Sequence, residues 1–152
     1  MPDAAAGPAA AEVIRARFPA TRLAVREQLA RVQTCLKQTA ASAGLRENVA
    51  LLLAEILNNI VEHSLVGQPD ARITLAITRD EAGIHVETWD AGRPLPPQLL
   101  ASPRLPERPV DLVDMPEGGF GWFIIHALAD DMFYERNDGT NRLSFRLTEP
   151  AD

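Results

Sequence analysis

The segment from Arg46 to Leu65 places the strongest constraint on the fold, because it has the pattern of a helix with a broad apolar face. Gly67 and Pro69 follow it directly and predict its end. A helix of this kind must pack against a large apolar surface, which other parts of the chain have to supply. Its apolar residues are Val49, Leu52, Leu53, Ile56, Leu57, Ile60 and Val61.

Two β-hairpins are predicted to supply that surface. Residues 72–79 and 83–90 each alternate apolar with polar side chains, and the turn sequence RDEAG joins them. Residues 131–136 and 141–147 flank Asn137-Asp138-Gly139, which is a strong signal for a hairpin turn. The hairpins therefore predict a sheet that the helix can cover.

The N-terminal part of the chain predicts a tail, a strand and another helix. Residues 1–11 are rich in Ala and Pro and predict a flexible tail, and residues 12–20 predict a strand at the edge of the sheet. Thr21 is a good N-cap residue for a first helix, and Gly44 supplies its stop.

Seven prolines between residues 94 and 116 exclude most regular structure from the segment that connects the two hairpins. A connection this long is typical of a functional flap or of a disordered segment. It is followed by a short helix predicted at 120–131. Together the elements predict one α+β domain over residues 12–150, a two-layer sandwich with helices packed on one face of a mixed, mainly antiparallel sheet.

Length and charge narrow the classes of function. The chain has 152 residues, which is enough for one domain with its own core. Its net charge is −6 and its basic residues are scattered, which argues against direct nucleic-acid binding. The single Cys35 fits a reducing compartment. No secretory leader and no stretch long enough to span a membrane are present, so a cytoplasmic protein is expected.

The polar residues of the Arg46–Leu65 helix form two rows. Glu55, Asn59 and His63 are spaced i, i+4 and i+8 along one edge, and Asn58 and Glu62 form a row beside them. A carboxylate and an amide oxygen one turn apart suit Mg²⁺ and its waters, and the carboxylate also suits a role in orienting or deprotonating a hydroxyl. The same pattern also fits the solvent-facing stripe of an ordinary amphipathic helix.

Two glycine-containing segments contain further candidate ligand-binding residues. In WDAGRP, Asp90 ends a strand and Gly92 permits a sharp turn, and a carboxylate there suits the exocyclic amine of adenine. In EGGFGWFII, Gly118, Gly119 and Gly121 enter a helix whose backbone N–H groups favour a phosphate. Taken singly, an ordinary Asp-x-Gly turn and an ordinary loop-to-helix junction explain them as well.

In their order along the chain, these segments resemble the motifs of the GHKL ATPase superfamily. The resemblance covers about residues 12–148 and implies the Bergerat ATP-binding fold. Within the superfamily, the chain is most similar to the bacterial anti-sigma-factor serine kinases. The matching motifs are the N box Glu55-x-x-x-Asn59-x-x-x-His63, the first glycine box Asp90-x-Gly92-x-Pro94, the ATP lid at about 95–117, the second glycine box Gly118-Gly119-x-Gly121, and the terminal motif Gly139-Thr140-Asn141.

The resemblance implies a role for each matching residue. Asn59 would coordinate Mg²⁺, Glu55 would act as general base or orient the nucleophile, and Asp90 would bind the adenine amine. For His63, a nucleotide-site residue and a helix-packing histidine are both open. The remaining nucleotide-binding residues implied are Gly92, which would line the base pocket, Pro94 of the first glycine box, Gly118, Gly119 and Gly121 at the phosphates, and Thr140 in support of the adenine site.

The resemblance also implies a function. It is that of an ATP-dependent protein-serine kinase, using ATP/ADP and Mg²⁺, which phosphorylates a STAS-domain anti-anti-sigma-like protein in a partner switch. A sigma factor or another regulated protein would be held in turn, and a homodimer through the sheet is implied. Exposed candidates for docking are Arg22, Arg26 and Arg31 of the first helix, for which a solvated basic face is the alternative.

Two alternative functions stay open at this point. One is a nucleotide-binding module that sequesters its partner with little or no kinase activity. The other is the detached catalytic domain of a histidine kinase. An autonomous histidine kinase is not expected, because none of the three histidines lies on a predicted dimerisation helix. A gyrase- or chaperone-like ATPase is not expected either, because it needs a transducer domain after the last strand.

Overall fold

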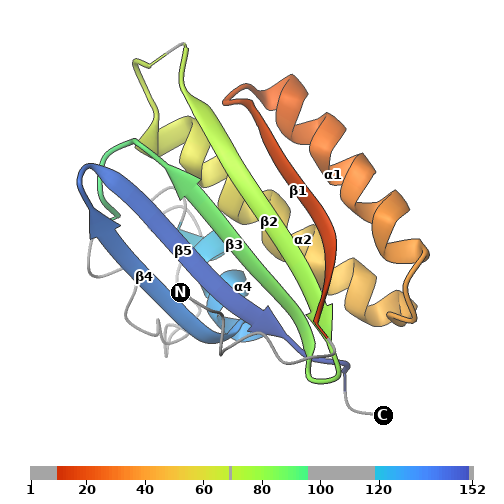
Figure 1. The fold of residues 1–152 in the computed structure, drawn as a ribbon. Helices are drawn as coiled ribbons and strands as arrows, with labels where there is room; N and C mark the ends of the chain where they lie inside the picture. The colour runs from red at the N-terminus through yellow and green to blue at the C-terminus, as the bar shows by residue number, and fades with distance from the viewer. Residues whose placement is uncertain (1–9, 69, 96–118, 151–152) are drawn as a thin grey trace.

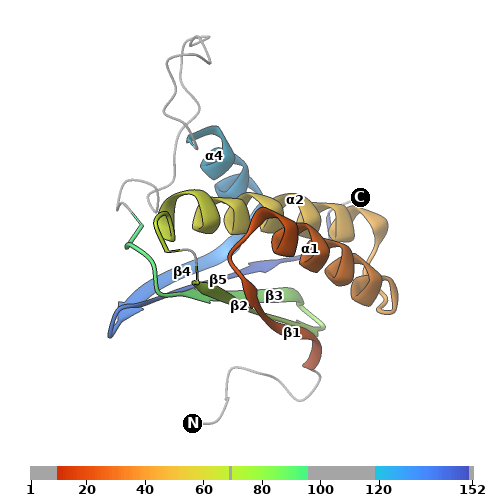
Figure 2. The same ribbon diagram turned by 90° about the horizontal axis from the view of Figure 1, so that it is seen from above.

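The described part of the chain forms a five-stranded sheet with helices on one face. The structure is a computed structural model, and it describes residues 10–68, 70–95 and 119–150. Helices and strands form two layers, and the sheet has the order β1-β2-β3-β5-β4 (Figures 1 and 2). The elements are β1 (Ala11–Pro19), α1 (Arg22–Lys37), α2 (Ala43–Asn59), the π-helix η1 (Ile60–Ser64), β2 (Arg72–Asp80), β3 (Gly83–Asp90), α4 (Gly119–Leu128), β4 (Asp130–Asn137) and β5 (Thr140–Leu147).

The predicted two-layer α+β sandwich is confirmed. The sheet was predicted to be mixed and mainly antiparallel, and each strand pairing in the described part of the chain is antiparallel. β1 lies at the edge and pairs with β2 alone, as expected for the first strand. Of the predicted tail and lid, residues 1–9 and 96–117 lie outside the described residues, and Ala11 already belongs to β1.

The boundary between the first two helices differs from the prediction. Thr21 caps α1 as expected, but α1 ends at Lys37 and not at Gly44. Gly44 instead lies in the first turn of α2, which begins before the predicted Arg46. The side chain of Ser42 explains the difference, because it accepts a hydrogen bond from the N–H of Leu45 at 3.0 Å and caps the helix.

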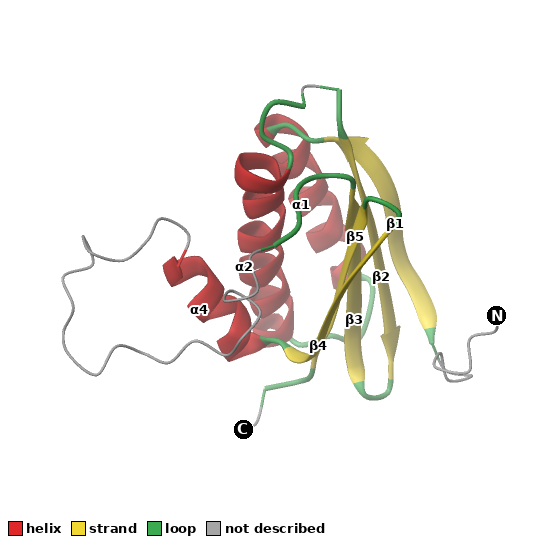
Figure 3. Ribbon diagram, turned by 90° about the vertical axis from the view of Figure 1, so that its left-hand side faces the viewer, coloured by secondary structure: helices red, strands yellow, loops and turns green. Residues whose placement is uncertain are grey.

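The core lies between the helices and the sheet, as the side view in Figure 3 shows. The apolar face of α2 is almost completely buried, and inward-facing residues of the strands meet it from the other side. The predicted turn between β4 and β5 is also present. Asp138 and Gly139 have φ angles of 51° and 77°, the combination that a tight two-residue hairpin requires. The side chains from α2 that are at most 1% exposed are Leu45, Val49, Leu52, Leu53, Ile56 and Leu57, and those from the sheet include Ile73, Leu75, Ile77, Ile84, Val86 and Phe145.

The last turn of the apolar helix is wider than predicted. From Ile60 to Ser64 the chain forms the π-helix η1, and the N–H of Leu65 donates to the carbonyl of Ile60 at 2.9 Å. π-helical turns inside α-helices are rare and often lie at functional sites. None of the helices in the described ranges has both the length and the apolar character needed to cross a membrane.

Candidate functional site

A small cavity between the end of the apolar helix and the sheet brings three sequence motifs together. Asn59 comes from α2, Asp90 from the end of β3, and Asn141 from the start of β5. The cavity has a volume of about 20 Å³, which is room for about one water molecule. It is lined by Ile56, Asn59, Ile60, Ser64, Thr88, Asp90, Leu95, Tyr134, Asn141 and Leu143.

Asp90 presents a carboxylate to this cavity. The residue is 6% exposed, and its Oδ1 accepts hydrogen bonds from the N–H of Gly92 at 2.9 Å and from Nδ2 of Asn141 at 3.0 Å. Burial raises the pKa of Asp90 above its ordinary value, against the opposing effects of these two hydrogen bonds and the charge of Arg136. Since Oδ2 receives no hydrogen bond from the described residues, it is the oxygen that suits an amine of a ligand.

Asn141 holds Asp90 and the chain that follows it. Its Nδ2 donates to Asp90 Oδ1, to the carbonyl of Gly92 at 3.1 Å and to the carbonyl of Arg93 at 3.0 Å. Asn141 is 3% exposed, so these polar contacts are shielded from solvent. The side chain therefore fixes the exit of β3 against the start of β5.

The oxygen of the Asn141 amide accepts hydrogen bonds from two side chains of β4. This Oδ1 accepts hydrogen bonds from the Tyr134 hydroxyl at 2.8 Å and from Nη1 of Arg136 at 2.7 Å. The Tyr134 hydroxyl also accepts the N–H of Leu95 at 2.9 Å, and Arg136 donates to the carbonyl of Gly92 at 2.8 Å. Residues 92 to 95 are thus tied to β4 as well as to β5.

Sequence reasoning singled out Thr140 in place of Asn141. The structure places Thr140 exposed at the hairpin, paired with Asn137, and it does not line the cavity. The alternation of β5 contains the signal that identifies the inward residue. Asn141 has the parity of the buried residues Leu143 and Phe145, whereas Thr140 has the parity of the opposite face.

Asn59 is oriented by its own helix. Its Nδ2 donates to the backbone carbonyl of Glu55 at 2.7 Å, which leaves the amide oxygen Oδ1 as the atom that suits a cation. Glu55 is half-buried one turn earlier, and no described residue makes a hydrogen bond or an ion pair with its carboxylate. The pair predicted from the sequence therefore lies on consecutive turns of α2.

His63 departs from the predicted row. It lies in η1, is exposed, and does not line the cavity. The i, i+4, i+8 spacing assumes an α-helix throughout, and the wider π-helical turn breaks that relation after Asn59.

Gly92 has a backbone role that the sequence alone did not define. A Cβ atom added there would lie 2.2 Å from the carbonyl oxygen of Ser64, and the next N–H, of Arg93, donates to that oxygen at 2.8 Å. Only glycine permits this close approach between η1 and the exit of β3. Pro94 is exposed and its neighbour Leu95 lines the cavity instead.

The second glycine box is only partly described. Gly118 lies outside the described residues, while Gly119 and Gly121 fall in the first turn of α4. Helix α4 packs against α2, and its Ile125 is fully buried in the core. Helix α4 therefore packs beside the helix that carries Asn59.

Comparison with known proteins agrees with this geometry. Residues 18–147 match the model of the histidine kinase-like ATPase domain, which is most of the chain. The chain belongs to this family. Membership confirms the predicted relation to the GHKL superfamily, and it makes this an ATP-binding type of domain.

Individual proteins show the same relationship. The serine/threonine-protein kinase BtrW of Bordetella bronchiseptica is 36% identical over 105 residues, which cover 68% of this chain and 70% of BtrW. The SiaB-SiaC complex from Pseudomonas aeruginosa contains a chain of the same fold, with 18% identity, a TM-score of 0.61, and coverage of 90% of this chain and 89% of that one. The RsbU and RsbW domains of Rv1364c from Mycobacterium tuberculosis give a TM-score of 0.57 at 17% identity, over 91% of this chain. The present chain covers 34% of the chain in that structure.

Proposed function

We propose that the chain is an ATP-dependent protein-serine kinase that acts as an anti-sigma-factor-like partner switch. The observation that carries the proposal is that Asn59 and Asp90 line one cavity between α2 and β3. Family membership supplies the class of nucleotide, and the 36% identity to a serine/threonine-protein kinase supports a side-chain hydroxyl of a protein as the acceptor.

Each group in the site has a distinct proposed role. Asp90 accepts the adenine amine at Oδ2, and the cavity of about 20 Å³ has to widen for a base to enter. Asn59 offers Oδ1 to Mg²⁺, which when bound would neutralise charge on the phosphates and take its other ligands from phosphate and water. Glu55 orients or deprotonates the acceptor hydroxyl. Gly119 and Gly121 offer backbone N–H groups to the phosphates at the start of α4.

A groove beside the predicted N box is the proposed docking site for the protein substrate. It has a volume of about 310 Å³ between α1 and the end of α2, and it is lined by Arg22, Val25, Arg26, Leu29, Asn58 and Glu62. At its rim Arg22 donates to Glu62 at 3.0 Å, an exposed ion pair that a partner can replace at small cost. We propose a STAS-domain protein as the occupant, with a sigma factor or another regulated protein as its competitor. That the SiaB fold was solved in a complex with SiaC supports a protein partner.

Charge-reversal variants of α1 test whether the partner binds in this groove. Reversal of charge in Arg26→Glu should weaken binding of the partner, while Arg31→Glu should not, because Arg31 is exposed on the same helix but does not line the groove. Equal effects of both variants on the partner's Kd would contradict a specific groove.

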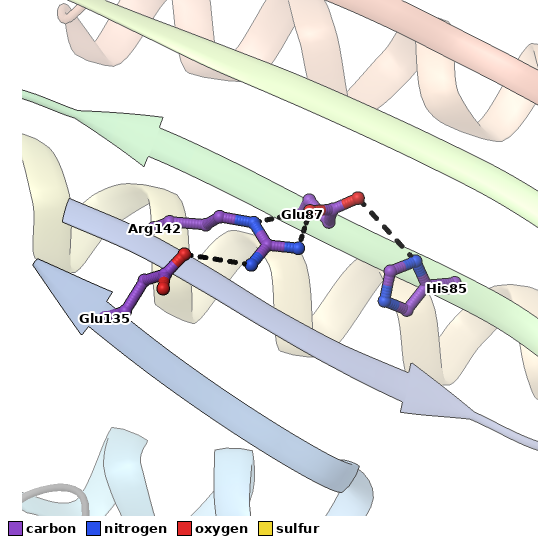
Figure 4. Close-up of polar contacts among 4 residues, drawn as sticks. All are labelled: His85, Glu87, Glu135 and Arg142. Atoms are coloured by element: carbon purple, nitrogen blue, oxygen red, sulfur yellow. Dashed lines mark hydrogen bonds and ion pairs between the residues drawn. The ribbon is translucent and has the colours of Figure 1, made fainter. Parts of the chain in front are cut away.

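The open face of the sheet is the proposed surface for a homodimer. Arg142 donates from Nε to Glu87 at 2.8 Å and from Nη1 to Glu135 at 3.2 Å, and His85 lies beside Glu87 (Figure 4). Phe133 on the same face is 51% exposed, so it adds an apolar side chain that a second copy could cover. Sedimentation equilibrium tests this proposal, and a Phe133→Lys variant with the same mass in solution as the wild type would contradict it.

Phosphoryl transfer itself is tested with γ-labelled ATP, Mg²⁺ and a STAS-domain partner. Label should appear on a serine of the partner and be lost in Asn59→Ala and Glu55→Gln. Matched controls on the same helix are Asn48→Ala and Glu47→Gln, which lie about two turns before Glu55. Nucleotide binding without transfer would favour a sequestering module, and acid-labile label on a histidine would favour a histidine-kinase catalytic domain.

The cellular location is proposed to be the cytoplasm. The single cysteine, Cys35, is a free thiol that is half-buried in α1, which suits a reducing compartment.

A further inference from the structure

One buried polar atom in the cavity is left unsatisfied by the fold. Thr88, on β3, is 1% exposed, and its Oγ1 is buried without a hydrogen bond from any described residue. The large majority of buried side-chain polar atoms in native proteins are hydrogen-bonded, and leaving one unpaired destabilises a fold. The hydroxyl therefore requires an explanation.

The position of Thr88 shows that packing does not require a hydroxyl there. Its side chain faces the helices in the same row as Ile84 and Val86, which are both fully buried aliphatic residues. Valine has nearly the same shape as threonine and would fill the space without an unpaired polar atom. The difference between the two residues is the hydroxyl, and Thr88 is one of the residues that line the cavity with Asp90.

Thr88 and Asp90 are two residues apart on one strand, so their side chains point the same way into one cavity. Asp90 offers an acceptor, and a threonine hydroxyl can donate. Adenine presents the complementary pair, since its exocyclic amine is a donor and the neighbouring ring nitrogens N1 and N7 are acceptors. An acceptor and a donor side by side are the arrangement by which amide side chains read adenine in nucleic acids.

We propose that Thr88 Oγ1 donates a hydrogen bond to a ring nitrogen of the adenine whose amine Asp90 binds, so that Thr88 is a specificity-determining residue. The inference rests on the proposed nucleotide site and extends it. The carboxylate by itself recognises only the amine, whereas the pair of Thr88 and Asp90 reads two adjacent groups of the base and selects adenine over guanine, which has a carbonyl at the place of the amine.

A structural water is the competing explanation. The cavity has room for about one water, which would satisfy the hydroxyl without any role in base recognition. The two explanations differ in what removal of the hydroxyl changes. A base contact affects nucleotide affinity, and a structural water affects the stability of the free protein.

The test measures the Kd of ADP by titration calorimetry and the Tm of the free protein. Thr88→Val should weaken ADP binding about tenfold, the usual scale for one hydrogen bond, with Tm unchanged or raised. Thr88→Ser keeps the hydroxyl and should stay within about threefold of wild type. Thr78→Val, a half-buried position on the open face of the neighbouring strand, is the matched control and should leave Kd unchanged.

Nucleotide analogues identify which ring nitrogen of adenine accepts the hydrogen bond from Thr88. The 1-deaza and 7-deaza forms of ADP each lack one ring nitrogen, and the analogue that lacks the acceptor of Thr88 should bind wild type and Thr88→Val equally. The inference is overturned if Thr88→Val binds ADP with wild-type affinity, or if it lowers Tm and leaves Kd unchanged. If the wild type itself binds no ADP, the proposed function is wrong and this inference falls with it, an outcome distinct from the first two.

Discussion

The side-chain amide of Asn141 joins the ends of two neighbouring strands, because it donates to Asp90 Oδ1 at 3.0 Å across the pairing of β5 with β3. The same amide accepts hydrogen bonds from Tyr134 and Arg136 of β4. A single buried side chain thus orients the carboxylate of the candidate site and holds the chain that leaves it.

Replacement of Asn141 should therefore affect both stability and binding. Asn141→Ala leaves several buried donors and acceptors unpaired, and we expect the free energy of unfolding to fall by about 2–4 kcal/mol. Urea denaturation measures the loss, and the Kd of ADP should rise in the same variant. Thr140→Ala is the matched control, since Thr140 is exposed, and it should stay within about 0.5 kcal/mol of wild type. Equal losses in the two variants would contradict the central position of Asn141.

Asp90→Asn should separate binding from stability. The amide keeps an oxygen that can accept from Asn141 and from the N–H of Gly92, but it loses the charge that suits an amine of the ligand. Because burial raises the pKa of Asp90 above its ordinary 3.8, the folded state binds more protons than the unfolded state just above that value. The contribution of Asp90 to the free energy of unfolding therefore falls as the pH rises from 3.8 to the raised pKa. The Asp90→Asn variant lacks this dependence on pH.

The measurement is the free energy of unfolding of both proteins from pH 3 to pH 8. The stability of Asp90→Asn relative to wild type should increase with pH and then level off above the raised pKa, while ADP binding is lost. A relative stability that decreases with rising pH would mean that the pKa of Asp90 is lowered in the folded protein.

The structure also shows which features the sequence was able to predict. Some short local patterns predicted the structure correctly. Thr21 caps the start of α1, and Asp138-Gly139 forms the turn of the last hairpin. Gly44 does not end the first helix, because Ser42 caps the start of α2 and Gly44 falls in the first turn of that helix. The motif assigns Thr140 to the adenine site, whereas the period of two along β5 places Asn141 on the inward face.

Other features depend on contacts between distant segments, which no local pattern contains. The π-helical turn at Ile60–Ser64 is coupled to the close approach of Gly92, from a strand exit far along the chain. The partners of Asn141 come from three separate segments, β3, its exit and β4. The unpaired hydroxyl of Thr88 is recognisable only once the cavity around it is known.

Gly92 tests the contact between η1 and the exit of β3. Gly92→Ala places a Cβ atom 2.2 Å from the carbonyl oxygen of Ser64, so the backbone has to shift, and we expect a loss of about 2–4 kcal/mol in the free energy of unfolding. Gly67→Ala is the control, because its φ of 81° disfavours alanine while the space around it is open. That variant should lose about 1 kcal/mol, measured by the same urea denaturation. A Gly92→Ala protein as stable as Gly67→Ala would show that the contact is not tight in solution.

The N-terminus of α2 offers a last prediction, on the dependence of stability on pH. Glu149, after the last strand, accepts hydrogen bonds from the hydroxyl of Ser42 and from its N–H at 3.1 Å, so it completes the cap of the helix that carries Glu55 and Asn59. These hydrogen bonds lower the pKa of Glu149 below its ordinary 4.5. A carboxylate with a lowered pKa stabilises the folded state at pH values above its ordinary pKa. This stabilisation is lost as the pH falls through the lowered pKa. Glu149→Gln should therefore have a lower Tm than wild type at pH 7, with a difference that shrinks as the pH falls below 4.5. Glu81→Gln, an exposed position on the turn between β2 and β3, is the control and should follow wild type throughout. A Tm difference for Glu149→Gln that persists unchanged at the lowest pH would assign its effect to packing and not to the charge.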